Sequence, residues 1–157
     1  MFLSVFDIFK VGVGPSSSHT IGPMVAAGRF LAHLRALPFS VSGLRASLHG
    51  SLAFTGVGHA TDRAVILGLA GFDAETYDAD KAEAELYRIM AEHVVMPDDL
   101  PPLRFNPQED LHFDFGPALP GHANGMILMG TDAQGDVITQ ETYYSCLLYT
   151  SPSPRDS

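Results

Sequence analysis

The sequence is poor in cysteine, lysine and clustered positive charge, and each shortage excludes a class of protein. A single cysteine, Cys146, rules out an internal disulfide framework, so a cytoplasmic location is the default expectation. Lys10 and Lys81 are the only lysines, and neither stands in a phosphate-binding context, which argues against a pyridoxal-phosphate enzyme. The net charge of -9, with no basic cluster, argues against a nucleic-acid partner. No apolar run is long enough to cross a bilayer, so no membrane partner is expected.

The sequence does contain enough apolar material for one folded domain. Hydrophobic residues make up 46% of the 157 positions, an ordinary share for a globular chain with a single core. After Ser145 the composition changes abruptly to serine, proline and aspartate, which cannot build a core. We therefore expect one domain over residues 1–145 and a non-native tail over residues 146–157, with an ordinary flexible C-terminal tail as the alternative.

Periodicity along the chain predicts the secondary structure. Apolar residues at helical spacing predict helices over residues 20–37, 61–69 and 80–94. Alternating or β-branched stretches predict strands over residues 44–49, 103–105, 111–115, 126–131 and 137–143, the last two joined as a hairpin. The predicted class is therefore α+β, with mixed helices packed on a largely antiparallel sheet. Four histidines in these elements are interpreted as structural or solvent-facing side chains: His33, His49, His93 and His112. For His49 the alternative is a side chain that faces the serine-rich loop from the end of its strand.

The stretch before the first helix collects hydroxyl groups at a helix start. Gly14 and Pro15 break the preceding segment, and Ser16, Ser17, Ser18, His19 and Thr20 follow. Thr20 is a good N-cap residue, so hydroxyls and free amide N–H groups converge where the helix dipole is positive. Such a site suits a carboxylate or a phosphate. The alternative is a serine-rich turn that only caps the helix.

Two later loops repeat the combination of glycine, histidine and a polar partner. His59 precedes Thr61 and Asp62 at the start of a helix, and His122 stands near Asn124 in a turn-rich loop. If the three loops meet, they form a pocket with anion donors and several proton carriers near neutral pH. Such a pocket suits removal of a proton next to a carboxylate, or elimination from a small hydroxy acid. His19, His59, Asp62 and His122 are also metal-ligand types, but their long spacings give a metal site little support.

Four motifs in this order resemble bacterial iron–sulfur L-serine dehydratase. They are SVFDIFK at 4–10, GPSSSHTIGPM at 14–24, GSLA at 50–53 with TGVGHATD at 55–62, and GHANGM at 121–126. ETYYS at 141–145 is also similar to the family, which would continue with a valine and a glycine run, whereas Cys146 follows here. The resemblance covers the beta portion of that enzyme, which is either the N-terminal domain of a single chain or a separate subunit.

The resemblance implies deamination of L-serine to pyruvate and ammonia by an enzyme that carries a [4Fe–4S] cluster. In the family one open iron site acts as a Lewis acid on the leaving hydroxyl. The cluster is held by cysteines of an alpha portion that lies outside this chain, so the chain alone is expected to be inactive. The implied partners are L-serine and an alpha domain or alpha subunit, and the intact enzyme is expected to be a homo-oligomer.

Carried over position by position, the resemblance also implies roles for the loop residues. Ser16, Ser17, Ser18, His19 and Thr20 would bind the substrate carboxylate. His59 is the favoured base for the α-proton and His19 the competing candidate, Thr61 and Asp62 would support His59, and His122 and Asn124 would line the pocket. The beta portion is also similar to the allosteric substrate-binding domain of some D-3-phosphoglycerate dehydrogenases. The alternative function is therefore a non-catalytic regulatory domain that binds a small carboxylate, although the proton-carrying histidines favour the enzyme.

Overall fold

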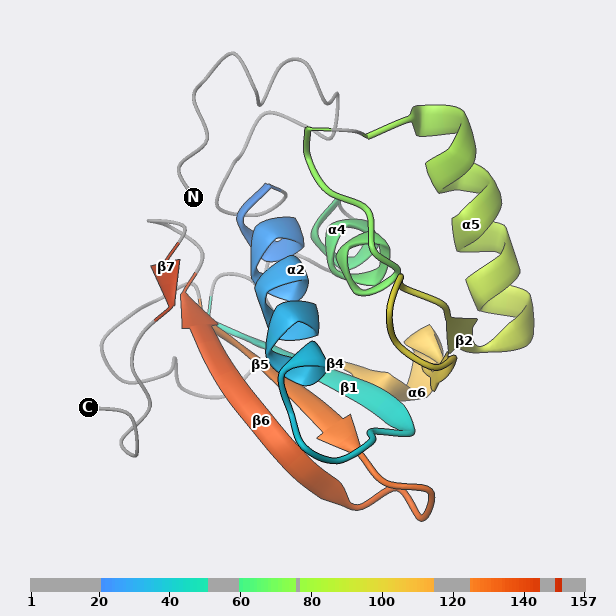
Figure 1. The fold of residues 1–157 in the computed structure, drawn as a ribbon. Coiled ribbons are helices and arrows are strands. Elements are labelled where there is room, and N and C mark those ends of the chain that lie inside the picture. The colour runs from blue at the N-terminus through green and yellow to red at the C-terminus, as the bar shows by residue number, and fades with distance from the viewer. Residues whose placement is uncertain (1–20, 51–59, 76, 115–124, 145–148, 151–157) are drawn as a thin grey trace.

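Strand β1 (Gly43–His49) lies at the centre of a seven-stranded sheet in the computed structural model, which describes residues 21–50, 60–75, 77–114, 125–144 and 149–150 (Figure 1). On one side β1 pairs antiparallel with β5 (Gly125–Thr131), which pairs antiparallel with β6 (Val137–Tyr144). On its other side β1 pairs parallel with β3 (Leu103–Arg104) and β4 (Leu111–Asp114). The two longest pairings are antiparallel, and the predicted α+β class is confirmed.

The two faces of the sheet differ in what covers them. Along β1 the side chains of Leu44, Ala46 and Leu48 are buried, whereas Arg45 and Ser47 between them are half-buried. Successive side chains of a strand point to opposite faces, so the first set faces the core and the second faces outward. Figure 1 shows the longer helices together on one side of the sheet, which is the side that the apolar set requires.

Helix α2 (Ile21–Arg35) packs on the sheet through the stripe that its sequence predicts. Met24, Ala27, Leu31 and Leu34 are all buried, which confirms the predicted apolar face. The interpretation of His33 as a solvent-facing side chain is wrong. Its Nε2 lies 2.8 Å from Thr139 Oγ1 on β6, and its ring stacks on Phe30. The imidazole therefore docks the helix onto the sheet.

Helix α4 (Ala60–Leu69) packs against α2 through Gly68. A Cβ at this position would stand 2.6 Å from the Cβ of Ala27 and 2.9 Å from the backbone oxygen of Met24, so only glycine permits the approach. The sequence predicts a close backbone approach at the small residues Ala26, Ala27 and Gly28 of α2. Ala27 does make this contact, but Gly28 takes no part in it, since a Cβ there would meet nothing within 4 Å. The sequence predicts that Gly71 stops this helix, and Gly71 does follow its end with a left-handed backbone, at φ +102°.

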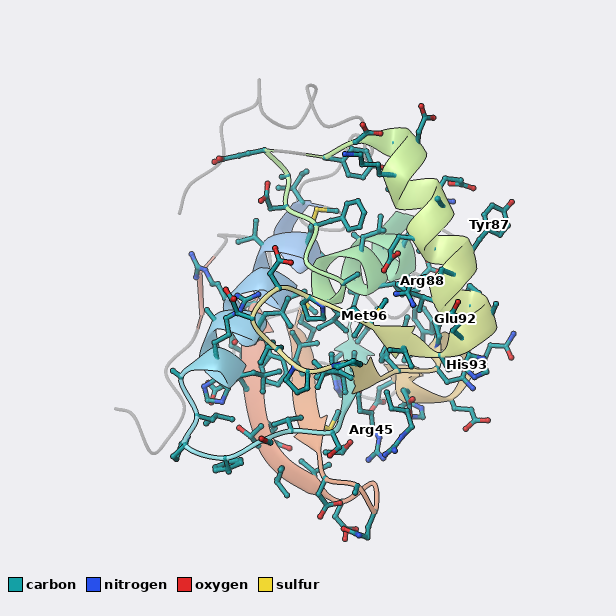
Figure 2. The ribbon with its side chains drawn as sticks, turned by 45° about the vertical axis from the view of Figure 1, so that its right-hand side comes forward. Arg45, Tyr87, Arg88, Glu92, His93 and Met96 are labelled. Atoms are coloured by element: carbon teal, nitrogen blue, oxygen red, sulfur yellow. The ribbon has the colours of Figure 1, made fainter. Side chains whose placement is uncertain are left out.

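Helix α5 (Ala79–Glu92) begins at the N-cap residue Asp78, whose carboxylate accepts from the N–H groups of Asp80 and Lys81 at 3.0 and 3.1 Å. The sequence predicts that this helix runs to residue 94, with His93 on its apolar stripe, and this is wrong. His93 is the C-cap in a left-handed conformation, at φ 61°. Arg88 bonds Glu85 and Glu92 and also donates to the carbonyl of Val94, which holds the chain where it leaves the helix (Figure 2).

Three short elements are absent from the predictions. Strand β2 (Val94–Val95) pairs with β3, strand β7 (Tyr149–Thr150) pairs with the end of β6, and helix α6 (Pro107–Asp110) follows the N-cap residue Asn106. Each of the three is a two-residue pairing or a single helical turn whose sequence shows no repeat, whereas the equally short β3 and β4 lie in stretches that alternate between apolar and polar residues. Among the helices that the structure describes, none is both long and apolar enough to cross a membrane.

Candidate functional site

The carboxyl end of β1 is where the predicted loops attach to the fold. His49 pairs with Asp114 at the end of β4, Leu48 pairs with Met126 near the start of β5, and Gly125 pairs with Tyr144 at the end of β6. The segment with His59 therefore leaves the sheet at the same end where the segment with His122 and Asn124 leaves β4 and enters β5.

Helix α2 presents its N-terminus at this same end of the sheet. His33 contacts Thr139 near the start of β6, and the charge of Arg29 acts on Tyr143 near the end of β6. Helix α2 therefore runs antiparallel to β6, so Ile21 lies toward the end where β6 finishes. The serine-rich segment joins the helix directly before Ile21. Three segments separated in the sequence thus attach to one region of the fold.

Most of the predicted site residues belong to segments that lie outside the described residues. These are Ser16, Ser17, Ser18, His19, Thr20, His59, His122 and Asn124, together with most of the 146–157 tail. Thr61 and Asp62 are described, and both lie in the first turn of α4.

Thr61 is a buried polar residue whose hydroxyl has no hydrogen-bond partner among the described residues. Its exposed fraction is 1%, and among the described residues no group forms a hydrogen bond with its Oγ1. An unpaired buried hydroxyl costs about 1–3 kcal/mol, so such groups are rare unless a ligand uses them. The first turn of a helix also favours negative charge, because its N–H groups point outward and the helix dipole is positive there. The α4 start is therefore suited to bind an anionic group.

Asp62 helps to order the α4 start. One of its carboxylate oxygens accepts from the backbone N–H of Arg63 at 2.8 Å. The Arg63 guanidinium in turn forms an ion pair with Glu83 of α5, also at 2.8 Å. The first turn of α4 is thus tied to α5 by the residues that follow Thr61.

Sequence reasoning missed a polar cluster on the outer face at the carboxyl end of β1. His49 is 7% exposed, its Nε2 lies 2.8 Å from Ser47 Oγ, and its Nδ1 lies 3.6 Å from Asp114 Oδ2. The interpretation of His49 as structural left these partners unnamed. The spacing of Ser47 and His49, two residues apart on one strand, was the available signal, because such residues share a face. The contribution of Asp114 depends on the pairing of β4 with β1, which the sequence does not reveal.

Tyr143 places a buried phenol near the end of β6, which lies at the same end of the sheet as His49. Burial raises the pKa of its phenol above the usual range, the charge of Glu141 adds to this, and Arg29 opposes it. The Tyr143 side chain is 4% exposed and faces α2. It therefore remains a neutral hydrogen-bonding group throughout the physiological pH range.

A groove of about 450 Å³ lies beside the α4 start, between α4, α5, α6 and β4. Its lining is mostly apolar, with Ile66 of α4, Leu86 and Met90 of α5, and Phe113 of β4. Tyr87 projects from α5 at its rim and is 71% exposed (Figure 2). Of the site residues predicted from the sequence, Asp62 is among the described residues that line this groove. The described residues that line the groove include no histidine, so this part of the chain does not supply the proton carriers expected of the loops.

In the part of the chain that the structure describes, no group of three or more His, Cys, Asp or Glu side chains is placed to bind a metal ion. The donor set of the whole sequence also does not fit an iron–sulfur cluster. Such clusters need several cysteine thiolates, and the chain has one cysteine. A cluster of this kind would have to be held by residues outside this chain.

Comparison with known proteins finds one family. The profile described as "Serine dehydratase beta chain" matches residues 4–146. L-serine dehydratase of Helicobacter pylori strain J99 is 43% identical over 142 residues, which is 90% of this chain and 31% of the relative. L-serine dehydratase of Streptomyces coelicolor is also 43% identical, over 92% of this chain and 32% of the relative. L-serine dehydratase 1 of Escherichia coli K12 is 38% identical over 91% of this chain. The chain spans about a third of the length of the curated relatives that it matches.

Proposed function

Because the chain belongs to the serine dehydratase beta-chain family, we propose that it is the substrate-binding and proton-transfer portion of an L-serine dehydratase. The reaction removes the α-proton and the β-hydroxyl of L-serine and leaves an enamine. Its imine tautomer takes up water and releases pyruvate and ammonia. The relatives named L-serine dehydratase support this substrate.

The buried hydroxyl of Thr61 is the observation that carries the proposal. It stands unbonded among the described residues, in the first turn of a ten-residue helix, and it follows His59 by two positions. A donor of this kind at a helix start binds one oxygen of the substrate carboxylate, so the α-carbon is held close to the His59 segment. The serine-rich segment before α2, with Ser16, Ser17, Ser18 and Thr20, binds the rest of the carboxylate.

The histidines carry the proton. His59 takes the α-proton, and His19 is the competing base, because an imidazole is the side chain best suited to exchange a proton near neutral pH and both residues belong to segments that attach to this region. Thr61 and Asp62 support His59, and His122 and Asn124 line the pocket. Tyr143 stays neutral at the same end of the sheet and does not compete for the proton.

A [4Fe–4S] cluster is supplied by an alpha portion, which corresponds to the two-thirds of the relatives that this chain does not span. The single cysteine supports this division, because this chain cannot supply the thiolates. The alpha portion is either a further domain or a separate subunit.

The experiment is a pyruvate assay on the chain combined with an alpha portion and reconstituted without oxygen with iron and sulfide. We expect pyruvate from L-serine, and a loss of at least 100-fold in kcat for His59→Ala if His59 is the base. His19→Ala should then change KM more than kcat. The opposite pattern would assign the base to His19. Full cluster content with no pyruvate would overturn the proposal.

Calorimetry on the 157-residue chain separates the enzyme from the regulatory alternative. The proposal expects L-serine to bind this chain and to turn over once the alpha portion is present. Binding of L-serine without turnover in any assembly would instead support a domain that only senses a small carboxylate.

A further inference from the structure

His49 joins the ends of two strands that the proposed site depends on. It is the last residue of β1, and it pairs with Asp114, the last residue of β4. Its Nε2 contacts Ser47 Oγ at 2.8 Å within β1, and its Nδ1 faces Asp114 Oδ2 at 3.6 Å across the pair of strands. The imidazole is 7% exposed, so it is held in place by packing as well as by its two polar partners.

The Ser47, His49 and Asp114 side chains have the order of a nucleophilic triad, but the backbone excludes that chemistry. Ser47 lies inside a central strand, opposite His112 on β4 and Ile127 on β5. The N–H groups around it serve the two strand ladders, so they are not available as oxyanion donors. The cluster therefore holds structure in place and does not attack a substrate.

The position of the cluster indicates what it holds. The chain leaves β1 after His49 and Gly50 and continues into the 51–59 segment, which ends at His59. It leaves β4 after Asp114 and continues into the 115–124 segment, which contains His122 and Asn124. Gly50 follows His49 with a left-handed backbone, at φ 62°, so the chain turns immediately beyond the cluster.

We infer that His49 is a positioning residue, which bridges Ser47 and Asp114 and thereby sets the separation of the two strand ends that carry the His59 and His122 segments. The inference rests on the proposed function for its effect on catalysis, whereas the bridge itself stands on the two contacts. A misplacement of about 1 Å in a reacting group can cost roughly 100-fold in rate, so a bridge at this point affects kcat without touching substrate.

Two conservative variants of His49 each remove one of its two polar contacts. His49→Asn keeps a polar atom at the position of Nδ1 and loses the contact with Ser47. His49→Gln keeps one at the position of Nε2 and loses the contact with Asp114. His112→Gln is the matched control, because His112 lies on the same face of the neighbouring strand, opposite Ser47, and is exposed.

The first measurement is hydrogen exchange on the 157-residue chain, which does not depend on activity. We expect both His49 variants to speed exchange in peptides that cover residues 50–60 and in peptides that cover residues 114–125, and His112→Gln to change neither. Faster exchange in only one of these segments, or in neither, would overturn the bridge.

The second measurement is the steady-state kinetics of the chain combined with an alpha portion. Each His49 variant should lower kcat about tenfold and leave KM for L-serine within about threefold, while His112→Gln behaves as the unmodified protein. Unchanged kcat in a folded His49 variant would overturn the positioning role. If the unmodified assembly makes no pyruvate, the proposed function fails, and the exchange experiment still decides the bridge.

Discussion

Gly68 of α4 lies so close to Ala27 of α2 that a Cβ at position 68 would stand 2.6 Å from the Cβ of Ala27. The same Cβ would stand 2.9 Å from the backbone oxygen of Met24, which cannot move aside as a flexible side chain can. The two helices therefore touch backbone to backbone, and this contact sets how α4 crosses α2.

Gly68→Ala should destabilise the protein by about 1–3 kcal/mol, because the added methyl group forces two buried helices apart. Urea unfolding of the variant and the unmodified chain measures the difference. Gly28→Ala is the control, since Gly28 is exposed on α2 with nothing within 4 Å of an added Cβ. It should raise stability by about 0.5–1 kcal/mol, as glycine is unfavourable in a helix interior. Equal effects at the two positions would contradict the close contact.

The contact between His33 and Thr139 should be measurable as a coupling energy. The two atoms are 2.8 Å apart and join α2 to β6, and Glu141 Oε2 lies 3.9 Å from the same imidazole nitrogen. A double-mutant cycle with His33→Ala and Thr139→Val should give a coupling of about 0.5–1.5 kcal/mol in urea unfolding. Thr142→Val tests the specificity, because Thr142 lies on the opposite face of β6, and its coupling to His33→Ala should be close to zero. A similar coupling for both threonines would argue against the docking role of His33.

Asp78 should contribute to stability as a cap. Its Oδ1 accepts from two backbone N–H groups of the first turn of α5. Asp78→Ala removes both bonds and should cost about 0.5–2 kcal/mol. Asp78→Ser keeps a capping oxygen and should recover most of that loss. Thermal unfolding of the two variants distinguishes capping from a general effect of charge, since serine restores the bond and not the charge.

Tyr143 should make the protein less stable at high pH. The phenol has a raised pKa in the folded protein, so the folded chain keeps a proton that the unfolded chain releases above about pH 10. Stability from this group is fully present below that pH and is lost as the pH rises further. Tyr143→Phe should therefore lose less stability than the unmodified chain between about pH 8 and pH 11. Tyr87→Phe is the control at an exposed tyrosine, and it should follow the unmodified chain.

Thr61→Val should separate ligand binding from folding. Valine has nearly the shape of threonine and removes the hydroxyl that no described group bonds. Stability should stay the same or rise by up to about 1 kcal/mol, while the affinity for L-serine should fall about tenfold or more, as expected for a hydrogen bond to a charged group. Calorimetry with L-serine and urea unfolding provide the two measurements. A clear loss of stability with unchanged affinity would make Thr61 a structural residue.

Local sequence patterns predicted the main helices and strands because each was long enough to show its period. The stripe of Met24, Ala27, Leu31 and Leu34 and the alternation along β1 are both present in the structure. Two predictions were wrong because the conformation or partner of a single histidine does not follow from its spacing in the sequence. His93 fits the stripe of α5 by spacing, yet it adopts the left-handed conformation that ends the helix. His33 lies beside the predicted apolar stripe, yet Thr139, more than 100 residues later, is its partner.

The same division holds for the candidate site. The motifs alone identified the family, because four of them follow one another in order, and the match over residues 4–146 confirms that resemblance. The motifs also drew attention to Thr61 and Asp62. They did not reveal the cluster of Ser47, His49 and Asp114, since Asp114 is 65 positions from His49 and its place depends on a parallel pairing of strands.

The sequence by itself determined the α+β class, the helix faces and the family, since these depend on the periodicity and order of nearby residues. Only the tertiary structure decided that β1 would take β4 as a parallel neighbour and that α2 would run antiparallel to β6. Those choices depend on burial and hydrogen bonding between distant segments, which local periodicity does not encode. They attach the three motif segments to one region of the fold and leave the Thr61 hydroxyl buried there without a described partner.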